Sequence, residues 1–115
     1  MTTEEKQLQL LLTDLCARLP YDTIVSVDNG KYREDTKLRP YHLADFNTLG
    51  IRPHLRPMES ITKEEKEQIR DLWIGADTKT YATRLIDFYN KHHLDYRGLI
   101  PMGLASPAPE GMYNN

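Results

Sequence analysis

A chain of 115 residues with 39% hydrophobic and 28% charged side chains has the size and composition of one soluble globular domain. Its formal net charge of -2 excludes a global electrostatic attraction to nucleic acid or to anionic membranes. Its apolar runs are far shorter than the roughly 20 residues that span a bilayer, and its acidic, polar start does not predict a signal peptide. The lone cysteine, Cys16, leaves no intramolecular disulfide and no multi-cysteine zinc site. We therefore expect a cytoplasmic protein with no cofactor and no membrane partner.

The first predicted element is an amphipathic helix. The pattern Thr2-x-x-Glu5 is a capping box that could open it, and Pro20 stops it. Apolar residues then recur on one face at helical spacing, and Cys16 belongs to this stripe as a small core residue. The stripe consists of Leu8, Leu11, Leu12, Leu15, Cys16 and Leu19.

A β-hairpin is predicted next. The β-branched run 23–27 is typical of a strand, and Asn29-Gly30 is a strong hairpin signal because a type I′ turn needs positive φ at both central residues. The return strand would cover 32–36. A third strand is predicted over 38–43, at a sheet edge because it contains Pro40. The proline-rich segment 51–57 is expected to be an extended connector or a short edge strand.

Two further helices are predicted in the second half. Thr62-x-x-Glu65 is a second capping box, and the helix after it ends near Gly75. Another helix begins at Asp77 or Thr78 and carries Tyr81, Leu85, Phe88 and His92 on one stripe. Segregated strands and helices predict a small α+β domain over residues 1–105, with a partly ordered tail over 106–115.

Charge is distributed unevenly along the chain. Residues 31–57 hold six basic and three acidic side chains, so the remainder is acidic. This dipole fits self-association or an anion site, and chance alone also accounts for it. Aromatic residues between the basic ones could stack single-stranded bases, although no nucleic-acid-binding motif is present. The candidate residues in this segment are Lys31, Tyr32, Arg33, Arg39, Tyr41, Arg52 and Arg56.

The four histidines are His42, His54, His92 and His93. Zinc could bind some of them, but adjacent residues on a helix point about 100° apart, so His92 and His93 do not converge on one ion. We expect one of this pair to cap a helix C-terminus and the other to pack against the strands. No catalytic fingerprint accompanies them, so no catalytic residue and no metal ligand is assigned.

The run Asp95-Tyr96-Arg97-Gly98 has two interpretations. In the structural one it is a helix-terminating turn, in which Asp95 pairs with an arginine, Tyr96 anchors the tail and Gly98 supplies a permissive backbone. In the functional one, Tyr96 and Arg97 form an exposed binding spot, because tyrosine and arginine are enriched among interface anchors. The structural interpretation is favoured, since the apolar pair Leu99-Ile100 follows at once.

Three blocks of sequence carry a resemblance to a known family. They are residues 10–21, 51–65 and 92–105 with 108–113, and the third, which begins His-His-Leu-Asp-Tyr-Arg-Gly, is the most specific. With these blocks the chain resembles a family of small uncharacterised proteins encoded by phages and prophages of Bacteroidetes bacteria. Leu94 stands where that pattern has phenylalanine. The resemblance implies a bacterial cytoplasm and a mobile-element setting, and implies no activity.

The sequence thus predicts a non-enzymatic accessory or regulatory protein that binds a protein partner of the phage or the host. The alternative is binding of nucleic acid or a nucleotide through the basic segment 31–57. Homo-oligomers are compatible with both. The candidate binding residues are Tyr32, Arg33, Arg39, Arg52, Arg56, Tyr96 and Arg97.

Overall fold

The chain begins with a long helix whose start is fixed by a capping side chain. The computed structural model describes residues 2–44 and 50–113. In it, Thr2 Oγ1 accepts the backbone N–H of Glu5 at 3.1 Å and opens α1, Thr3–Arg18. A 3₁₀ turn, Leu19–Tyr21, contains Pro20 and ends the helix where the sequence predicts.

The buried face of α1 differs from the predicted leucine stripe. Leu11, Asp14, Leu15 and Arg18 are buried, at spacings of three and four residues. Cys16 lies about 100° around the helix from Leu15 and is exposed, so its predicted place in the core is wrong. The leucine spacing does not predict the buried face correctly, because two positions of that face are occupied by the buried ion pair of Asp14 and Arg18.

The predicted hairpin is present, but its turn is not of the predicted type I′, because Gly30 has a positive φ and Asn29 does not. Strand β1, Ile24–Asp28, pairs antiparallel with β2, Arg33–Lys37. Gly30 in the connecting loop has a φ of +91°, which a residue with a side chain would adopt only with strain. The loop side chains close the turn further, since Asn29 Oδ1 accepts the backbone N–H of Lys31 at 3.0 Å.

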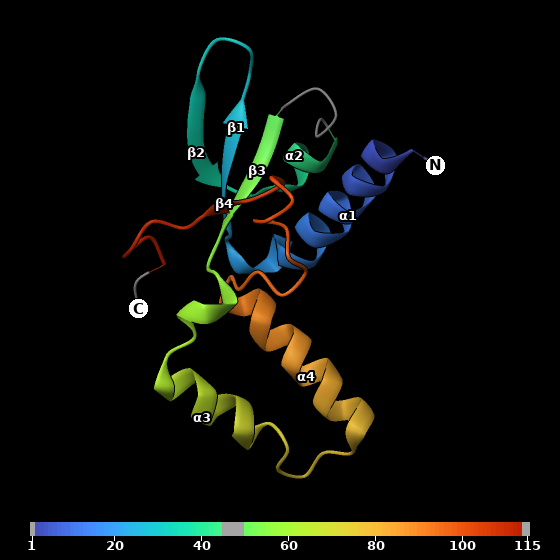
Figure 1. Ribbon diagram of the computed structural model, residues 1–115, viewed down its shortest axis with the longest axis vertical. Helices are drawn as coiled ribbons and strands as arrows, with labels where there is room; N and C mark the ends of the chain where they lie inside the picture. The colour runs from blue at the N-terminus through green and yellow to red at the C-terminus, as the bar shows by residue number, and fades with distance from the viewer. Residues whose placement is uncertain (1, 45–49, 114–115) are drawn as a thin grey trace.

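The segment expected to be an extended connector or a short edge strand is an interior strand. β3, Gly50–Leu55, pairs antiparallel with β1 and parallel with the short β4, Ser106–Pro107, so the sheet order is β2-β1-β3-β4 (Figure 1). Pro53 is tolerated there because β4 pairs only with His54 and Leu55 and leaves one side of Pro53 free.

The third strand predicted over 38–43 is wrong. Residues Pro40–Ala44 form a short helix, α2, in which Pro40 holds the first position, where its missing N–H costs nothing. The buried His42 stabilises the entry to this helix, because its Nδ1 accepts the backbone N–H of Arg39 at 2.9 Å. Proline therefore acts here as a helix start and not as an edge-strand residue.

The core lies between α1, one face of the sheet and the segment that follows α4. Its fully buried members include Leu15, Val25, Leu55 and Leu99. The segment expected to be a tail contributes β4 and is held further along by Tyr113, whose hydroxyl donates to the carbonyl of His54 at 2.7 Å. Residues 114–115 lie outside the described residues.

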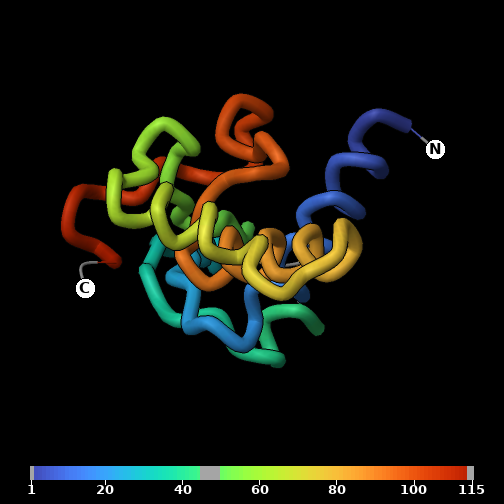
Figure 2. Tube along the Cα trace, turned by 90° about the horizontal axis from the view of Figure 1, so that it is seen from below, coloured from blue at the N-terminus to red at the C-terminus, as the bar shows by residue number. Residues whose placement is uncertain are grey.

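The last two helices form a hairpin that projects from the core. A 3₁₀ turn, Met58–Ser60, leads into α3, Lys63–Asp71, and a loop connects α3 to α4, Thr78–Lys91. Both views place α3 on the side of the C-terminal segment and α4 on the side of α1 (Figures 1 and 2). Four α-helices together with a four-stranded mixed sheet in the described residues confirm the predicted α+β class with its N-terminal helix, antiparallel hairpin and two further helices.

Candidate functional site

The structure brings together only part of the predicted basic site. Arg33 and Arg52 lie on the same, helix-free face of the sheet, because both share it with Ser26 and Asp28 of β1. Tyr32, which directly precedes Arg33 in the chain, is exposed, with 57% of its surface accessible. This cluster forms a polar surface of mixed charge.

The other predicted arginines lie apart and are paired with carboxylates. Arg39 Nη1 donates to Asp22 at 2.7 Å beyond the end of β2. Arg56 follows β3 and binds Glu65 through two hydrogen bonds of 2.8 and 2.6 Å. A guanidinium that a carboxylate already holds offers little free charge to a phosphate.

Arg97 and Tyr96 belong to a buried structural network. The carboxylate of Asp14 accepts Arg18 Nε at 2.8 Å and Arg97 Nη1 at 2.7 Å. The Arg97 guanidinium lies over the Tyr96 ring, 4.7 Å from its centroid. This network fastens α1 to the segment after α4, so the structural interpretation of these two residues has direct geometric support.

Asp95 has different partners from those predicted. It does not pair with an arginine; its carboxylate accepts the backbone N–H groups of Leu99 at 2.7 Å and Ile100 at 3.0 Å. Gly98 lies in the tight loop between Asp95 and Leu99 and has a φ of +74°, a backbone conformation that favours glycine. The sequence did not indicate this, because a carboxylate that closes a turn looks the same as one that forms an ion pair.

The adjacent histidines diverge, as predicted. His92 is the C-cap residue of α4, and His93 points the other way, where its ring stacks on Tyr113 with centroids 3.8 Å apart. His93 Nδ1 is also 3.0 Å from Thr23 Oγ1 on the core side. Burial lowers the pKa of His93 to about 4, so the ring is neutral near pH 7. Among residues 2–44 and 50–113, no three metal-binding side chains lie close enough to hold an ion.

An open groove of about 660 Å³ lies where the hairpin meets the core. Glu65 is one of its lining residues; its carboxylate, besides binding Arg56, accepts the backbone N–H of Thr62 at 3.0 Å and contacts His92 Nδ1 at 3.1 Å. The Arg56 hydrogen bonds lower the pKa of Glu65 to about 2. A carboxylate held this firmly is a poor proton acceptor near neutral pH, and it serves as a joint between hairpin and core. Ala108, Pro109 and Tyr113 form the far wall.

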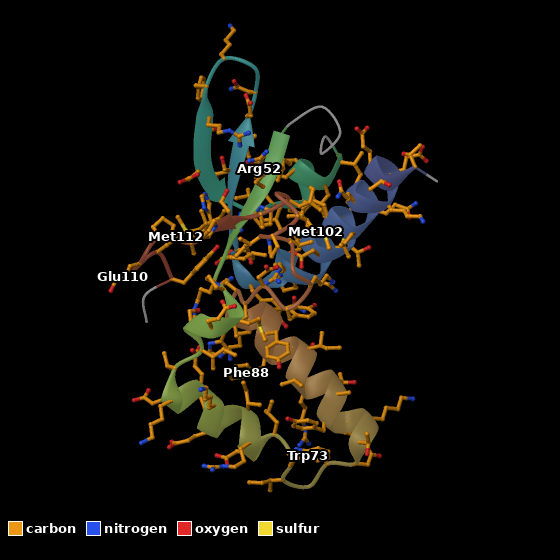
Figure 3. All side chains as sticks on the ribbon, viewed as in Figure 1. Arg52, Trp73, Phe88, Met102, Glu110 and Met112 are labelled. Carbon is orange, nitrogen blue, oxygen red and sulfur yellow. The ribbon has the colours of Figure 1, made fainter. Side chains whose placement is uncertain are left out.

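The most distinctive surface is that of the hairpin, residues 63–91. Within it, only Glu65 and Asn90 are buried. Trp73 stacks on Tyr81 with centroids 3.9 Å apart and still exposes 49% of its surface, at the end of the hairpin furthest from the core (Figure 3). Ile74 and Ile86 are 73% and 46% exposed. These three apolar side chains were not predicted as site residues; the only signal was Ile74 directly before the helix-ending Gly75.

The hairpin is nevertheless well formed. A capping box at Thr62 and Glu65 opens α3, and Asp77 Oδ1 accepts the backbone N–H of Thr80 at 2.7 Å at the start of α4. Arg84 Nη1 donates to the carbonyls of Leu72 and Ile74, both at 3.0 Å, and so satisfies the end of α3. Ile86 therefore lies on α4, and Trp73 and Ile74 lie in the hydrogen-bonded turn that follows α3.

No family model matches the chain, and no curated protein or solved structure matches it either. None of the helices in the described part is long and apolar enough to cross a membrane. Assignment of a function therefore depends on the geometry of the groove and the hairpin.

Proposed function

We propose that this chain is a small non-enzymatic protein that acts by binding a protein partner, and that the hairpin is its contact element. The observation that carries the proposal is the exposure of Trp73, Ile74 and Ile86 on a two-helix layer with almost no buried interior. A single layer of helices has no second layer against which to bury its apolar side chains. Apolar and aromatic side chains on ordered elements are typical anchors of protein interfaces.

The hairpin's charge favours a particular kind of partner. Residues 63–91 contain six basic and six acidic side chains, so the hairpin is neutral. A neutral surface gains no long-range attraction to polyanions such as nucleic acid or an anionic membrane. The partner it fits is a protein surface with apolar pockets for isoleucine and tryptophan, rimmed by charges of both signs.

The groove supports a binding role over a catalytic one. Glu65 and Arg56 are engaged with each other, and their ion pair positions the start of α3 relative to β3. We propose an accessory or regulatory role inside a bacterial cell that carries a phage or prophage, in keeping with the family resemblance of residues 92–105. The basic segment is the weaker candidate, because Arg39 and Arg56 are paired with carboxylates.

Site-specific photo-cross-linking in the bacterial host tests this function. A photoreactive amino acid replaces Ile86 or Ile74 in the full chain, and Lys37 on the exposed edge strand β2 is the matched control position. We expect a discrete protein adduct, identified by mass spectrometry, from both hairpin positions and not from position 37. Equal adducts from all three positions, or nucleic acid captured from position 37, would contradict the proposal.

A further inference from the structure

We infer that the protein partner of α3 is a second copy of this chain, which packs its own α3 antiparallel across a twofold axis at Glu67. The inference rests on the proposed function, because it takes the same hairpin to be the contact element. A twofold interface uses the same patch on both copies, so the patch must be complementary to itself. The outward face of α3 meets this requirement.

The face is defined by helical spacing. Lys63, Glu67 and Arg70 recur at intervals of four and three residues, so they share one side of α3. Ile74 continues this side, because the chain keeps a helical turn in which the Ile74 N–H donates to the Asp71 carbonyl at 3.1 Å. All of these residues are exposed, and the inward side carries the half-buried Ile69 and Leu72 instead.

Charges on the face are arranged symmetrically about Glu67. Lys63 precedes it by four residues and Asp71 follows it by four; Glu64 precedes it by three and Arg70 follows it by three. In an antiparallel pair centred on Glu67, each Lys63 faces Asp71 of the second copy and each Glu64 faces Arg70. Both oppositely charged pairs therefore occur twice.

Two of these residues oppose the dipole of their own helix. Lys63 is the first residue of α3 and Asp71 is the last, whereas a helix favours acidic side chains at its N-terminus and basic ones at its C-terminus. Within the described residues, neither side chain forms an ion pair that would offset this cost. Contacts with a second copy would offset it.

The apolar anchor of the interface is Ile74, the most exposed large hydrophobic side chain described. It follows Glu67 by seven residues, and Ser60 precedes Glu67 by seven. Antiparallel packing therefore places Ile74 past the N-terminus of α3 in the second copy, near the chain that enters that helix. The face involves about a dozen residues per copy, fewer than the roughly 20–30 of a standard interface, so we expect a dissociation constant in the micromolar range.

Sedimentation of the full chain over a range of concentrations tests this dimer. We expect Lys63→Glu to weaken the dimer about tenfold, and the double variant Lys63→Glu/Asp71→Lys to restore it, because the swap recreates the pairs with reversed signs. Both substitutions suit the dipole of α3, so weaker association of the single variant could not result from loss of the helix. Lys79→Glu, on α4, is the matched control and should leave the dissociation constant unchanged.

Glu67 supplies a second, independent readout. The two Glu67 carboxylates meet at the axis and repel, so Glu67→Gln should tighten the dimer about threefold. A chain that remains monomeric at millimolar concentration would overturn the second copy as partner, as would a dimer whose affinity does not respond to these variants. In both cases the proposed function would still hold if cross-links from Ile86 capture a different protein. If those cross-links are also lost, both the dimer and the proposed function are wrong.

Discussion

The core and the hairpin differ in which side chains they bury and which they expose. In the core, even charged groups are buried with partners: Asp14 and Arg18 have no exposed surface. In the hairpin, Glu65 and Asn90 are the only buried residues, while Ile74 and Ile86 remain exposed. Polar groups buried with partners make the core rigid, whereas apolar side chains exposed on ordered elements are typical of interaction sites. The comparison explains why stability should depend on the core, and it supports the proposal that the hairpin is the contact element.

The two regions meet at one ion pair. Arg56, directly after β3, binds Glu65 in the first turn of α3, and Arg56 also pairs through its backbone with the segment after α4. Changes to the core should therefore unfold the whole chain, changes at this joint should loosen the hairpin, and changes to the outer hairpin should leave stability almost intact.

The largest effect is expected from Asp14→Ala. The variant leaves Arg18 buried without its carboxylate and releases Arg97, so we expect the free energy of unfolding to fall by about 3–5 kcal/mol. Urea denaturation measures it. Asp87→Ala, at an exposed position of α4, is the control and should lower the value by less than about 0.5 kcal/mol. A loss below about 1 kcal/mol in Asp14→Ala would mean that the buried network does not hold the core.

The next largest effect is a pH dependence from His93. Burial lowers its folded pKa from 6.5 to about 4, so the unfolded chain binds the proton more readily between these values. Stability should therefore fall by about 2 kcal/mol as the pH drops from 6.5 to 4. His93→Asn should reduce that loss, because asparagine tolerates the φ of 60° at this position and does not titrate. Equal acid sensitivity in both proteins would contradict burial of His93.

A smaller effect is expected at the joint. Glu65→Gln removes the carboxylate from Arg56, so the hairpin should lose about 1–2 kcal/mol of stability. The native carboxylate, whose folded pKa of about 2 is below the ordinary 4.5, contributes fully above pH 4.5 and loses its contribution as the pH falls towards 2. Faster amide hydrogen exchange in α3 would report the loosening. Asp87→Asn, at an exposed position of α4, is the control and should leave the exchange rates of α3 unchanged.

The smallest effect is expected from Ile86→Ser. This side chain is already 46% exposed, so in dilute solution the free energy of unfolding should change by less than about 0.5 kcal/mol. Thermal unfolding at low protein concentration is the measurement. A loss above about 1.5 kcal/mol would place Ile86 in the core, and the division between core and hairpin would fail.

Local sequence signals predicted the elements better than their partners. The Thr2 cap, the capping box of Thr62 and Glu65, Asn29-Gly30 and Pro20 all act within a few residues, so the sequence alone predicted the helices and the first hairpin. Pro40 was ambiguous because the same ring starts a helix or blunts a strand.

Long-range pairings could not be read in this way. Arg97 and Asp14 are 83 positions apart, and no spacing rule connects them. The grouping of Arg33 with Arg52, and the separation of both from Arg56, likewise depends on strand register. Ile74 and Ile86 are exposed because the hairpin projects from the rest of the molecule (Figure 1), an arrangement that the sequence pattern does not specify.

Amide hydrogen exchange at two protein concentrations, about tenfold below and tenfold above the dissociation constant, tests most directly whether the hairpin is the contact element. Our account predicts added protection at high concentration in α3 and the turn up to Ile74, with β1 and β2 unchanged. Added protection along the exposed edge strand β2, with none in α3, would contradict it.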